Sequence, residues 1–137
     1  MNQLIGNCKC GQVQYSVAGS VLQVVVCHCN MCRQMTGSAF SSYVVVQDTN
    51  LTFTQGQKML ASYSVTEQTT RHFCTTCGTP IFNSNPATYS GLAMLYLGTL
   101  DGHETLSPRI DIFCESKLPW VRINEASKCF SRSPRNA

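Results

Sequence analysis

The sequence has few charges and no long apolar run, and these shortages exclude several classes of protein. Charged residues make up 12% of the 137 residues and apolar residues 43%, which excludes a disordered, highly charged chain. No apolar run approaches the ~20 residues that a membrane-spanning helix needs. The first ten residues have no basic stretch followed by an apolar one, so they predict no secretory signal peptide. We therefore expect a soluble, cytoplasmic protein without a membrane partner.

Clusters of basic residues are also absent. The formal net charge is +3, but this value counts every cysteine as neutral. Zinc binds cysteine as the thiolate. Two zinc sites, one with four thiolates and one with three, would together cancel the positive charge. Without a dense run of Lys and Arg, the sequence predicts no nucleic-acid partner.

Most of the chain has the pattern of short strands separated by turn residues, and its length fits one domain. The pattern predicts a mainly β protein with strands at residues 13–17, 22–27, 39–46, 51–53, 93–97 and 109–114. The best helix signal covers residues 30–35, with Asn30 as the N-cap and Gly37 just past the end. Residues 128–137 are polar and basic and contain Pro134. They predict a flexible C-terminal tail after a domain at residues 1–127.

The nine cysteines are the main functional signal. In a reducing cytoplasm they should not form disulfides. Seven of the nine fall into three tight groups, which are Cys8/Cys10, Cys27/Cys29/Cys32 and Cys74/Cys77. This is the spacing of metal ligands.

Two of the groups are pairs followed by glycine. Cys74 and Cys77 precede Gly78, as in a zinc knuckle, and Cys8 and Cys10 precede Gly11. Cys74 and Cys77, three positions apart, can reach one ion across a tight turn. Cys8 and Cys10 can do so because residues i and i+2 of an extended segment face the same side. Joined, the pairs make a closed four-cysteine site, which is usually structural.

The third group, with Cys27, His28, Cys29 and Cys32, offers three thiolates. Seven cysteines cannot fill two tetrahedral sites. One site must therefore take water, another side chain or a substrate as its last ligand. Three protein ligands and an open position are typical of a catalytic zinc.

The remaining candidates have simpler interpretations. His28 points away from its neighbouring cysteines if the segment is extended. Cys114 lies in an apolar run and predicts a small buried side chain, although it is the best outside candidate for the missing ligand. Cys129 falls in the predicted tail, where we expect no role. Tyr43, like the other aromatic residues, is expected in the core.

Five stretches make a more specific comparison possible. The sequence resembles the glutathione-dependent formaldehyde-activating enzyme (GFA) family, also called centromere-protein-V-like. The resemblance covers nearly the whole chain except the tail. The matching stretches, in family order, are Cys8–Gly11 (CKCG), Cys27–Phe40 (CHCNMCRQMTGSAF), Arg71–Phe82 (RHFCTTCGTPIF), Leu97–Asp101 (LGTLD) and Asp111–Trp120 (DIFCESKLPW).

The resemblance implies a β-tent fold of several small coiled antiparallel sheets around a structural zinc, which makes residues 1–127 a GFA-like zinc-binding domain. It implies two zinc sites, of which the second is labile. The ligands would be Cys8, Cys10, Cys74 and Cys77 for the structural zinc, and Cys27, Cys29 and Cys32 for the second.

The family's reaction joins formaldehyde to the thiol of glutathione, and its reverse is a carbon–sulfur lyase step. A small thiol such as glutathione is therefore the expected partner. Glutathione carries carboxylates, so a cation should bind it, and Arg33 is the nearest candidate, with Arg71 a second. Many family members have histidine where this chain has Asp111. A negative charge in the pocket there would disfavour an anionic thiol.

Two functions without catalysis remain open at this point. The chain could be a zinc-binding interaction module, which predicts two closed metal sites and no cleft. It could also be a redox or metal sensor in which Cys27, Cys29 and Cys32 release zinc on oxidation. A zinc site with an open position beside a cleft would favour the enzyme.

Overall fold

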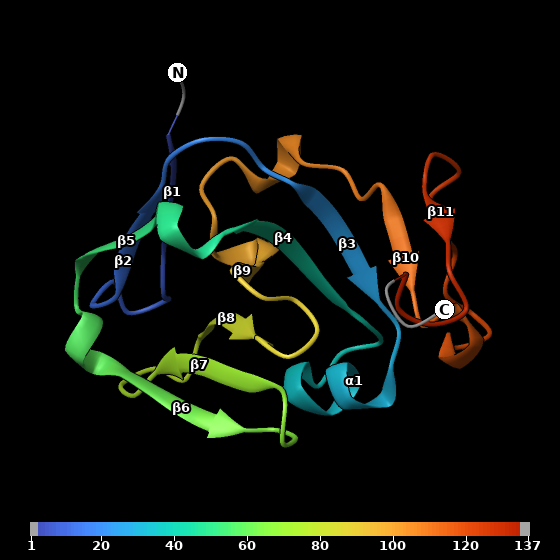
Figure 1. Ribbon diagram of the computed structural model, residues 1–137, viewed down its shortest axis with the longest axis horizontal. Coiled ribbons are helices and arrows are strands. Elements are labelled where there is room, and N and C mark those ends of the chain that lie inside the picture. Colours follow the sequence, from blue (N-terminus) through green and yellow to red (C-terminus); the bar gives the residue numbers. More distant parts are fainter. Residues whose placement is uncertain (1–2, 135–137) are drawn as a thin grey trace.

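The computed structural model describes residues 3–134 and is mainly β (Figure 1). Its strands form one sheet of three in the order β1-β2-β5 and one of eight in the order β11-β10-β3-β4-β9-β8-β7-β6. The strands are β1 (Leu4–Asn7), β2 (Gln14–Val17), β3 (Gln23–Cys27), β4 (Ser41–Gln47), β5 (Leu51–Gln55), β6 (Leu60–Ser64), β7 (Thr70–Cys74), β8 (Pro80–Ser84), β9 (Leu92–Tyr96), β10 (Ile110–Ile112) and β11 (Lys128–Cys129).

The predicted mainly β fold is confirmed, with differences in detail. Six predicted strands match β2, β3, β4, β5, β9 and β10. The sequence analysis missed the other five strands, β1, β6, β7, β8 and β11, because each mixes polar and apolar residues without a clean alternation. Not all pairing is antiparallel, since β10 runs parallel to both β3 and β11. Within residues 3–134, no helix is suited to span a membrane.

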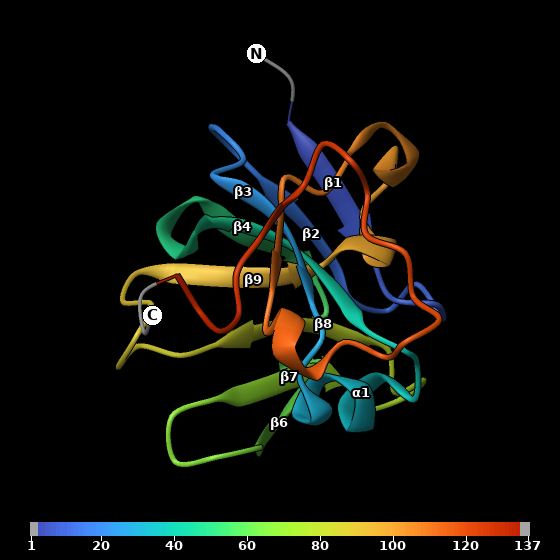
Figure 2. The ribbon, with the colours of Figure 1, turned by 90° about the vertical axis from the view of Figure 1, so that its right-hand side faces the viewer.

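The larger sheet curls, so that the β6-β7-β8 end lies below the end formed by β10, β3 and β4 (Figures 1 and 2). Its two faces are both apolar in the middle. Alternate residues of a strand face opposite sides. Val44, Val46 and Leu95 face the core shared with the smaller sheet, whereas Tyr43 and Val45 face the other side.

The smaller sheet closes the core from one side. Val13, Tyr15 and Val17 are buried there against the larger sheet. Gly6 lies directly over the Tyr15 ring, where an added Cβ would come within 2.3 Å of Cζ. This close approach requires glycine. The Tyr15 hydroxyl lies 2.6 Å from Thr99 Oγ1, within hydrogen-bond distance.

A short helix, α1 (Asn30–Thr36), follows β3 directly. Gly37 ends it with a left-handed φ of 69°, as predicted. The N-cap is Cys29 rather than Asn30, because the Cys29 sulfur accepts a hydrogen bond from the N–H of Cys32. The cap of the helix is therefore itself a candidate metal ligand.

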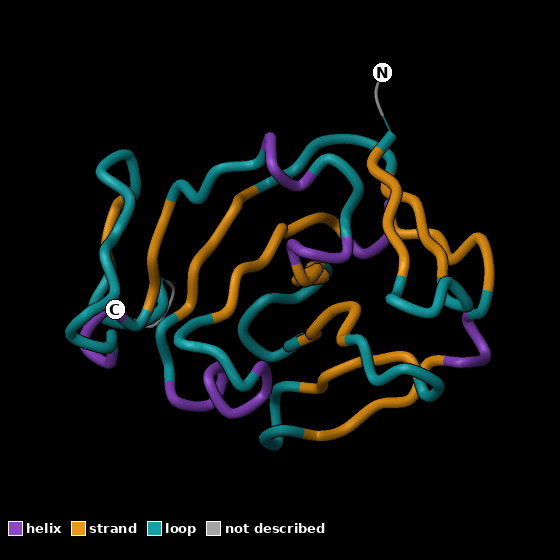
Figure 3. The backbone as a smooth tube through the Cα atoms, turned by 180° about the vertical axis from the view of Figure 1, so that it is seen from behind, coloured by secondary structure: helices purple, strands orange, loops and turns teal. Residues whose placement is uncertain are grey.

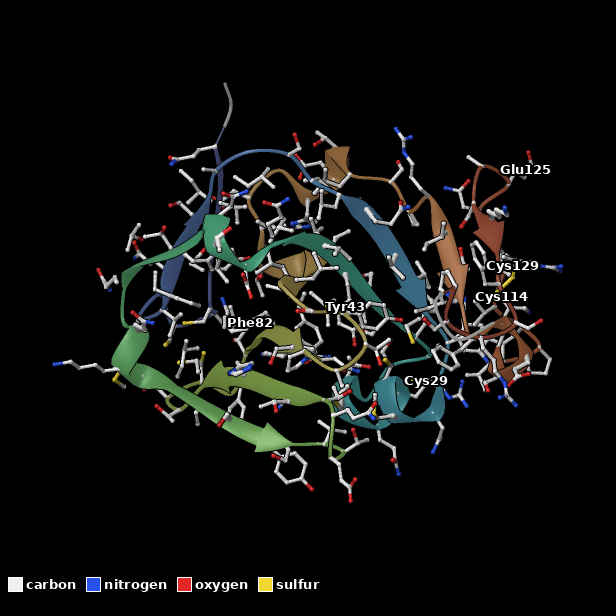
Figure 4. The ribbon with its side chains drawn as sticks, viewed as in Figure 1. Cys29, Tyr43, Phe82, Cys114, Glu125 and Cys129 are labelled. Atoms are coloured by element: carbon white, nitrogen blue, oxygen red, sulfur yellow. A yellow bond between two sulfur atoms is a disulfide. The ribbon has the colours of Figure 1, made fainter. Side chains whose placement is uncertain are left out.

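The predicted flexible tail is in part an ordered strap. Lys128–Cys129 form β11 beside β10, and Ser133 is buried. Cys129 forms a disulfide with Cys114, visible as a yellow bond in Figure 4. The expectation that no cysteine forms a disulfide is wrong for this pair, and Cys114 is excluded as the missing metal ligand. Residues 135–137 of the predicted tail lie outside the described residues. Figure 3, which views the molecule from behind, shows this strap, residues 128–134, beside β10.

Candidate metal centres and cleft

The structure brings the two glycine-backed cysteine pairs together. Cys8 and Cys10 lie in the turn after β1, and Cys74 and Cys77 lie at the turn between β7 and β8. Each turn closes with a hydrogen bond from glycine to the first cysteine, from Gly11 N to Cys8 O and from Gly78 N to Cys74 O. Both glycines have a positive φ, 81° at Gly11 and 76° at Gly78, a conformation that glycine adopts without strain.

The geometry of this four-cysteine cluster fits a metal ion. All four sulfurs lie within 4.8 Å of one another. The Sγ atoms of Cys8 and Cys10 are 3.5 Å apart, and those of Cys10 and Cys74 are 3.8 Å apart. A tetrahedral zinc with bonds of about 2.3 Å holds its sulfurs about 3.8 Å apart. Hydrogen bonds from the hydroxyl and backbone N–H of Thr79 lower the pKa of Cys77 to about 5, which favours the thiolate that a metal binds.

The second cluster forms where β3 meets α1. Cys27 is the last residue of β3, Cys29 is the N-cap of α1, and Cys32 lies in the first turn. Their sulfurs also lie within 4.8 Å of one another, with Cys27 and Cys29 3.5 Å apart. Hydrogen bonds from Cys27 and Cys32 lower the pKa of Cys29 to about 3. This donor set also fits zinc, with three protein ligands. In the described part of the chain no fourth His, Cys, Asp or Glu joins it.

A hydrogen-bonded network supports Cys32 from the sheet. The Cys32 sulfur is 3.1 Å from the Tyr43 hydroxyl, which in turn accepts a hydrogen bond of 3.2 Å from the amide of Asn83. The Asn83 oxygen accepts a hydrogen bond from Tyr96 at 2.9 Å. Because Asn83 donates to Tyr43, the hydroxyl hydrogen of Tyr43 is free to point at Cys32. Burial raises the pKa of Tyr43, so the hydroxyl stays a donor.

The sequence analysis missed this network. It assigned Tyr43 to the core, and it did not single out Asn83. The available signal was weak. A polar residue such as Asn83 inside an apolar strand indicates a buried hydrogen-bond partner, but not which partner.

We predict that Tyr43→Phe weakens metal binding by the three-cysteine cluster about 10- to 100-fold, the usual cost of losing a partner that orients a metal ligand. The ring stays, so the fold should remain cooperative. Competition with a chromophoric zinc chelator measures the affinity. Tyr63→Phe is the matched control, because Tyr63 is 63% exposed on β6. Equal affinities in the two variants would contradict a role for the Tyr43 hydroxyl.

Asp111 does not place a charge in a pocket. It is 3% exposed, and its Oδ2 is 2.6 Å from His28 Nε2. Its other oxygen accepts a hydrogen bond from Ser127. The expectation that Asp111 could repel an anionic substrate is therefore wrong. The pair instead connects the segment beside Cys27 to β10, consistent with His28 pointing away from the cysteines.

Neither candidate arginine lines the cleft described below. The guanidinium of Arg33 donates hydrogen bonds to the backbone oxygens of His28 and Ser116, the latter at 2.8 Å. It fixes α1 to its surroundings rather than facing a substrate, so the structure does not bring Arg33 to the cleft as the sequence analysis expected. Arg71 lies with its guanidinium 4.9 Å from the centre of the Phe73 ring.

A cleft of about 650 Å³ opens on the face of the larger sheet that is turned away from the core. Cys27, Cys29 and Cys32 form part of its wall, and Cys29 and Tyr43 are labelled in Figure 4. Side chains from β3, β4, β9 and β10 supply eight of the other nineteen lining residues. The apolar members include Leu22, Val25, Val45, Leu92, Met94, Ile110, Ile112 and Phe113. Phe113 has a φ of 56°, a conformation that non-glycine residues adopt infrequently.

Fold and site together define a mainly β protein with two cysteine clusters suited to metal ions, one of them beside a cleft. The family model described as "Glutathione-dependent formaldehyde-activating enzyme" matches residues 3–116, so the chain belongs to this family. A crystal structure of a Rhodobacter sphaeroides protein has the same fold, with a TM-score of 0.61 and 21% identity. The match covers 76% of this chain and 91% of that chain.

Proposed function

We propose that this chain is a zinc-dependent enzyme that makes or breaks the carbon–sulfur bond between a small thiol and an aldehyde, as in the formation of S-hydroxymethylglutathione. The observation that carries the proposal is the three-cysteine cluster in the wall of the cleft. A cluster with three protein donors has room for a donor from outside. Family membership supports the same chemistry.

The residues divide into two groups by role. Cys8, Cys10, Cys74 and Cys77 would hold a structural zinc that ties the start of the chain to the β7–β8 turn. Cys27, Cys29 and Cys32 would hold the second zinc, which with three protein ligands should be the more labile one. Bound there, zinc supplies an open coordination position at which a thiol ionises readily.

The rest of the chemistry requires little from the protein. The thiolate sulfur attacks the carbonyl carbon and forms the carbon–sulfur bond. The carbonyl electron pair moves to oxygen, which takes a proton from water, so the step is redox-neutral and reversible. The protein contributes position, because Tyr43 and the cap of α1 fix the sulfurs and the apolar wall holds the thiol.

The cleft favours an enzyme over a closed interaction module. A module would need both metal sites saturated by protein ligands and an exposed face for its partner. The described residues instead give one cluster four donors and the other three. The redox sensor shares the three-cysteine site but gives no reason for a cleft of about 650 Å³ beside it. The cytoplasmic location stays a prediction.

The test is NMR exchange between a thiol, formaldehyde and their hydroxymethyl adduct. Zinc-loaded protein should speed the exchange of at least one thiol, and removal of the labile zinc should return the rate to that without protein. Both glutathione and uncharged thiols belong in the panel. If no thiol in the panel exchanges faster with the zinc-loaded protein, the proposed function is wrong.

A further inference from the structure

The cleft beside Cys27, Cys29 and Cys32 has an unusual lining for a glutathione site. Within residues 3–134, none of its lining side chains is Lys, Arg, Asp or Glu. Its polar groups are neutral and come from Gln23, Gln68, Thr69, Asn83, Asn85, Thr88, Tyr43, Tyr89 and Ser133. Glutathione carries two carboxylates, and a carboxylate buried without a cation or several donors is strongly disfavoured.

The size of the cleft also bears on the substrate. Formaldehyde has two heavy atoms, whereas clefts of about 300–1,000 Å³ hold drug-sized ligands. The observed volume is about 650 Å³. The space must therefore hold the body of the other reactant, which is the thiol whose sulfur meets the cysteines.

The sequence of β3 explains why this wall is apolar. The run Val24, Val25 and Val26 places valine on both faces of the sheet. A strand with one face in water would instead carry polar residues on that face. Val25 pairs with Ile110 on one side and Tyr43 on the other, and Val45 pairs with Met94. The face of the sheet toward the cleft is thus mostly apolar beside the three sulfurs.

The nearest cation across the sheet is Arg71, whose Nε is buried without a hydrogen-bond partner among the described residues. Arg71 pairs across the sheet with Asn83, which lines the cleft. Its guanidinium lies over the Phe73 ring, and it is not part of the lining. Arg135, which follows the lining residue Pro134, lies outside the described residues.

We infer that the cleft selects an uncharged thiol with an apolar alkyl or aryl body, rather than glutathione. This inference rests on the proposed function for the sulfur chemistry but concerns a separate property, the charge of the body that the cleft accepts. Apolar contact with the β3, β4 and β9 side chains supplies the affinity. Gln68 in the lining supplies a neutral amide that can bond one uncharged polar group.

The experiment compares benzyl mercaptan with its para-carboxylate analogue, which has the same body plus one negative charge, and with glutathione. Exchange with formaldehyde and direct binding by calorimetry are both measured on the zinc-loaded full chain. We expect kcat/KM and affinity for benzyl mercaptan to exceed those for the carboxylate analogue at least about tenfold. Leu22→Lys should shrink this ratio, because Leu22 lines the cleft and is 47% exposed. Ile5→Lys, on the other sheet, is the matched control and should leave it unchanged.

Two results overturn the inference. One is equal or better binding of the carboxylate analogue or glutathione by the unaltered chain. The other is a preference for glutathione that Arg71→Gln or Arg135→Gln abolishes, since either arginine would then supply the missing cation. Failure of the proposed function gives a different result. No thiol would then exchange faster with the protein, but the ratio of the affinities for benzyl mercaptan and its carboxylate analogue would still report the charge preference.

Discussion

Cys77→Ser should give protein that is insoluble or lacks a cooperative melting transition. Cys77 is one of four sulfurs within 4.8 Å of one another, and they join the turn after β1 to the β7–β8 turn. Structural zinc in small peptides contributes on the order of 10 kcal/mol of folding free energy. A whole domain has a stability of about 5–15 kcal/mol, so the loss of this site removes most of it.

Thr76→Ser is the matched control for this prediction. It lies in the same turn, is exposed and keeps a hydroxyl that can bond the Gln12 side chain. Thermal unfolding followed by circular dichroism compares the two variants. We expect the control to melt like the unaltered chain. A soluble Cys77→Ser protein with a cooperative transition near that of the control would contradict the structural role of this cluster.

Cys29→Ala should reduce the exchange of thiol and formaldehyde to the rate without protein, while the fold persists. The change removes one of only three donors at the second cluster, so the labile zinc and its open position are lost together. It also removes the sulfur that caps α1, which costs about 1 kcal/mol of stability. NMR exchange measures the first effect and chemical denaturation the second.

Cys29→Ser separates these two effects. Serine is a good N-cap, so stability should recover, but a serine hydroxyl is a poor ligand for zinc beside thiolates. We expect this variant to be as inactive as Cys29→Ala. If Cys29→Ser exchanges thiol adducts at the rate of the unaltered chain, the three-cysteine cluster is not the reaction site.

The sequence could predict the cysteine clusters because their meaning is local. Glycine after Cys10 and Cys77 marks a turn that presents two sulfurs, and this turn forms as expected. The apolar run of β3 was likewise predicted to be a strand. That its second face forms a cleft wall depends on β10 and β9, which come from distant parts of the chain, so periodicity alone could not show it.

The errors have a common cause, which is tertiary pairing between residues far apart in the sequence. Asp111 was expected to charge a pocket, but it is buried against His28. Cys129 was placed in a loose tail, but the strap returns beside β10 and forms a disulfide with Cys114. Arg33 follows Cys32 directly, yet a helical turn directs it to backbone oxygens instead of the cleft. Adjacency in sequence was a poor guide to direction in each case.

The most direct measurement for the whole account is the zinc content per chain by elemental analysis. The unaltered protein should hold two zinc ions, and a brief treatment with chelator should leave one while the protein stays folded. Cys29→Ser should hold one from the start. One zinc in both proteins, or chelation that removes both ions at the same rate, would contradict the division into a closed structural site and an open reactive one.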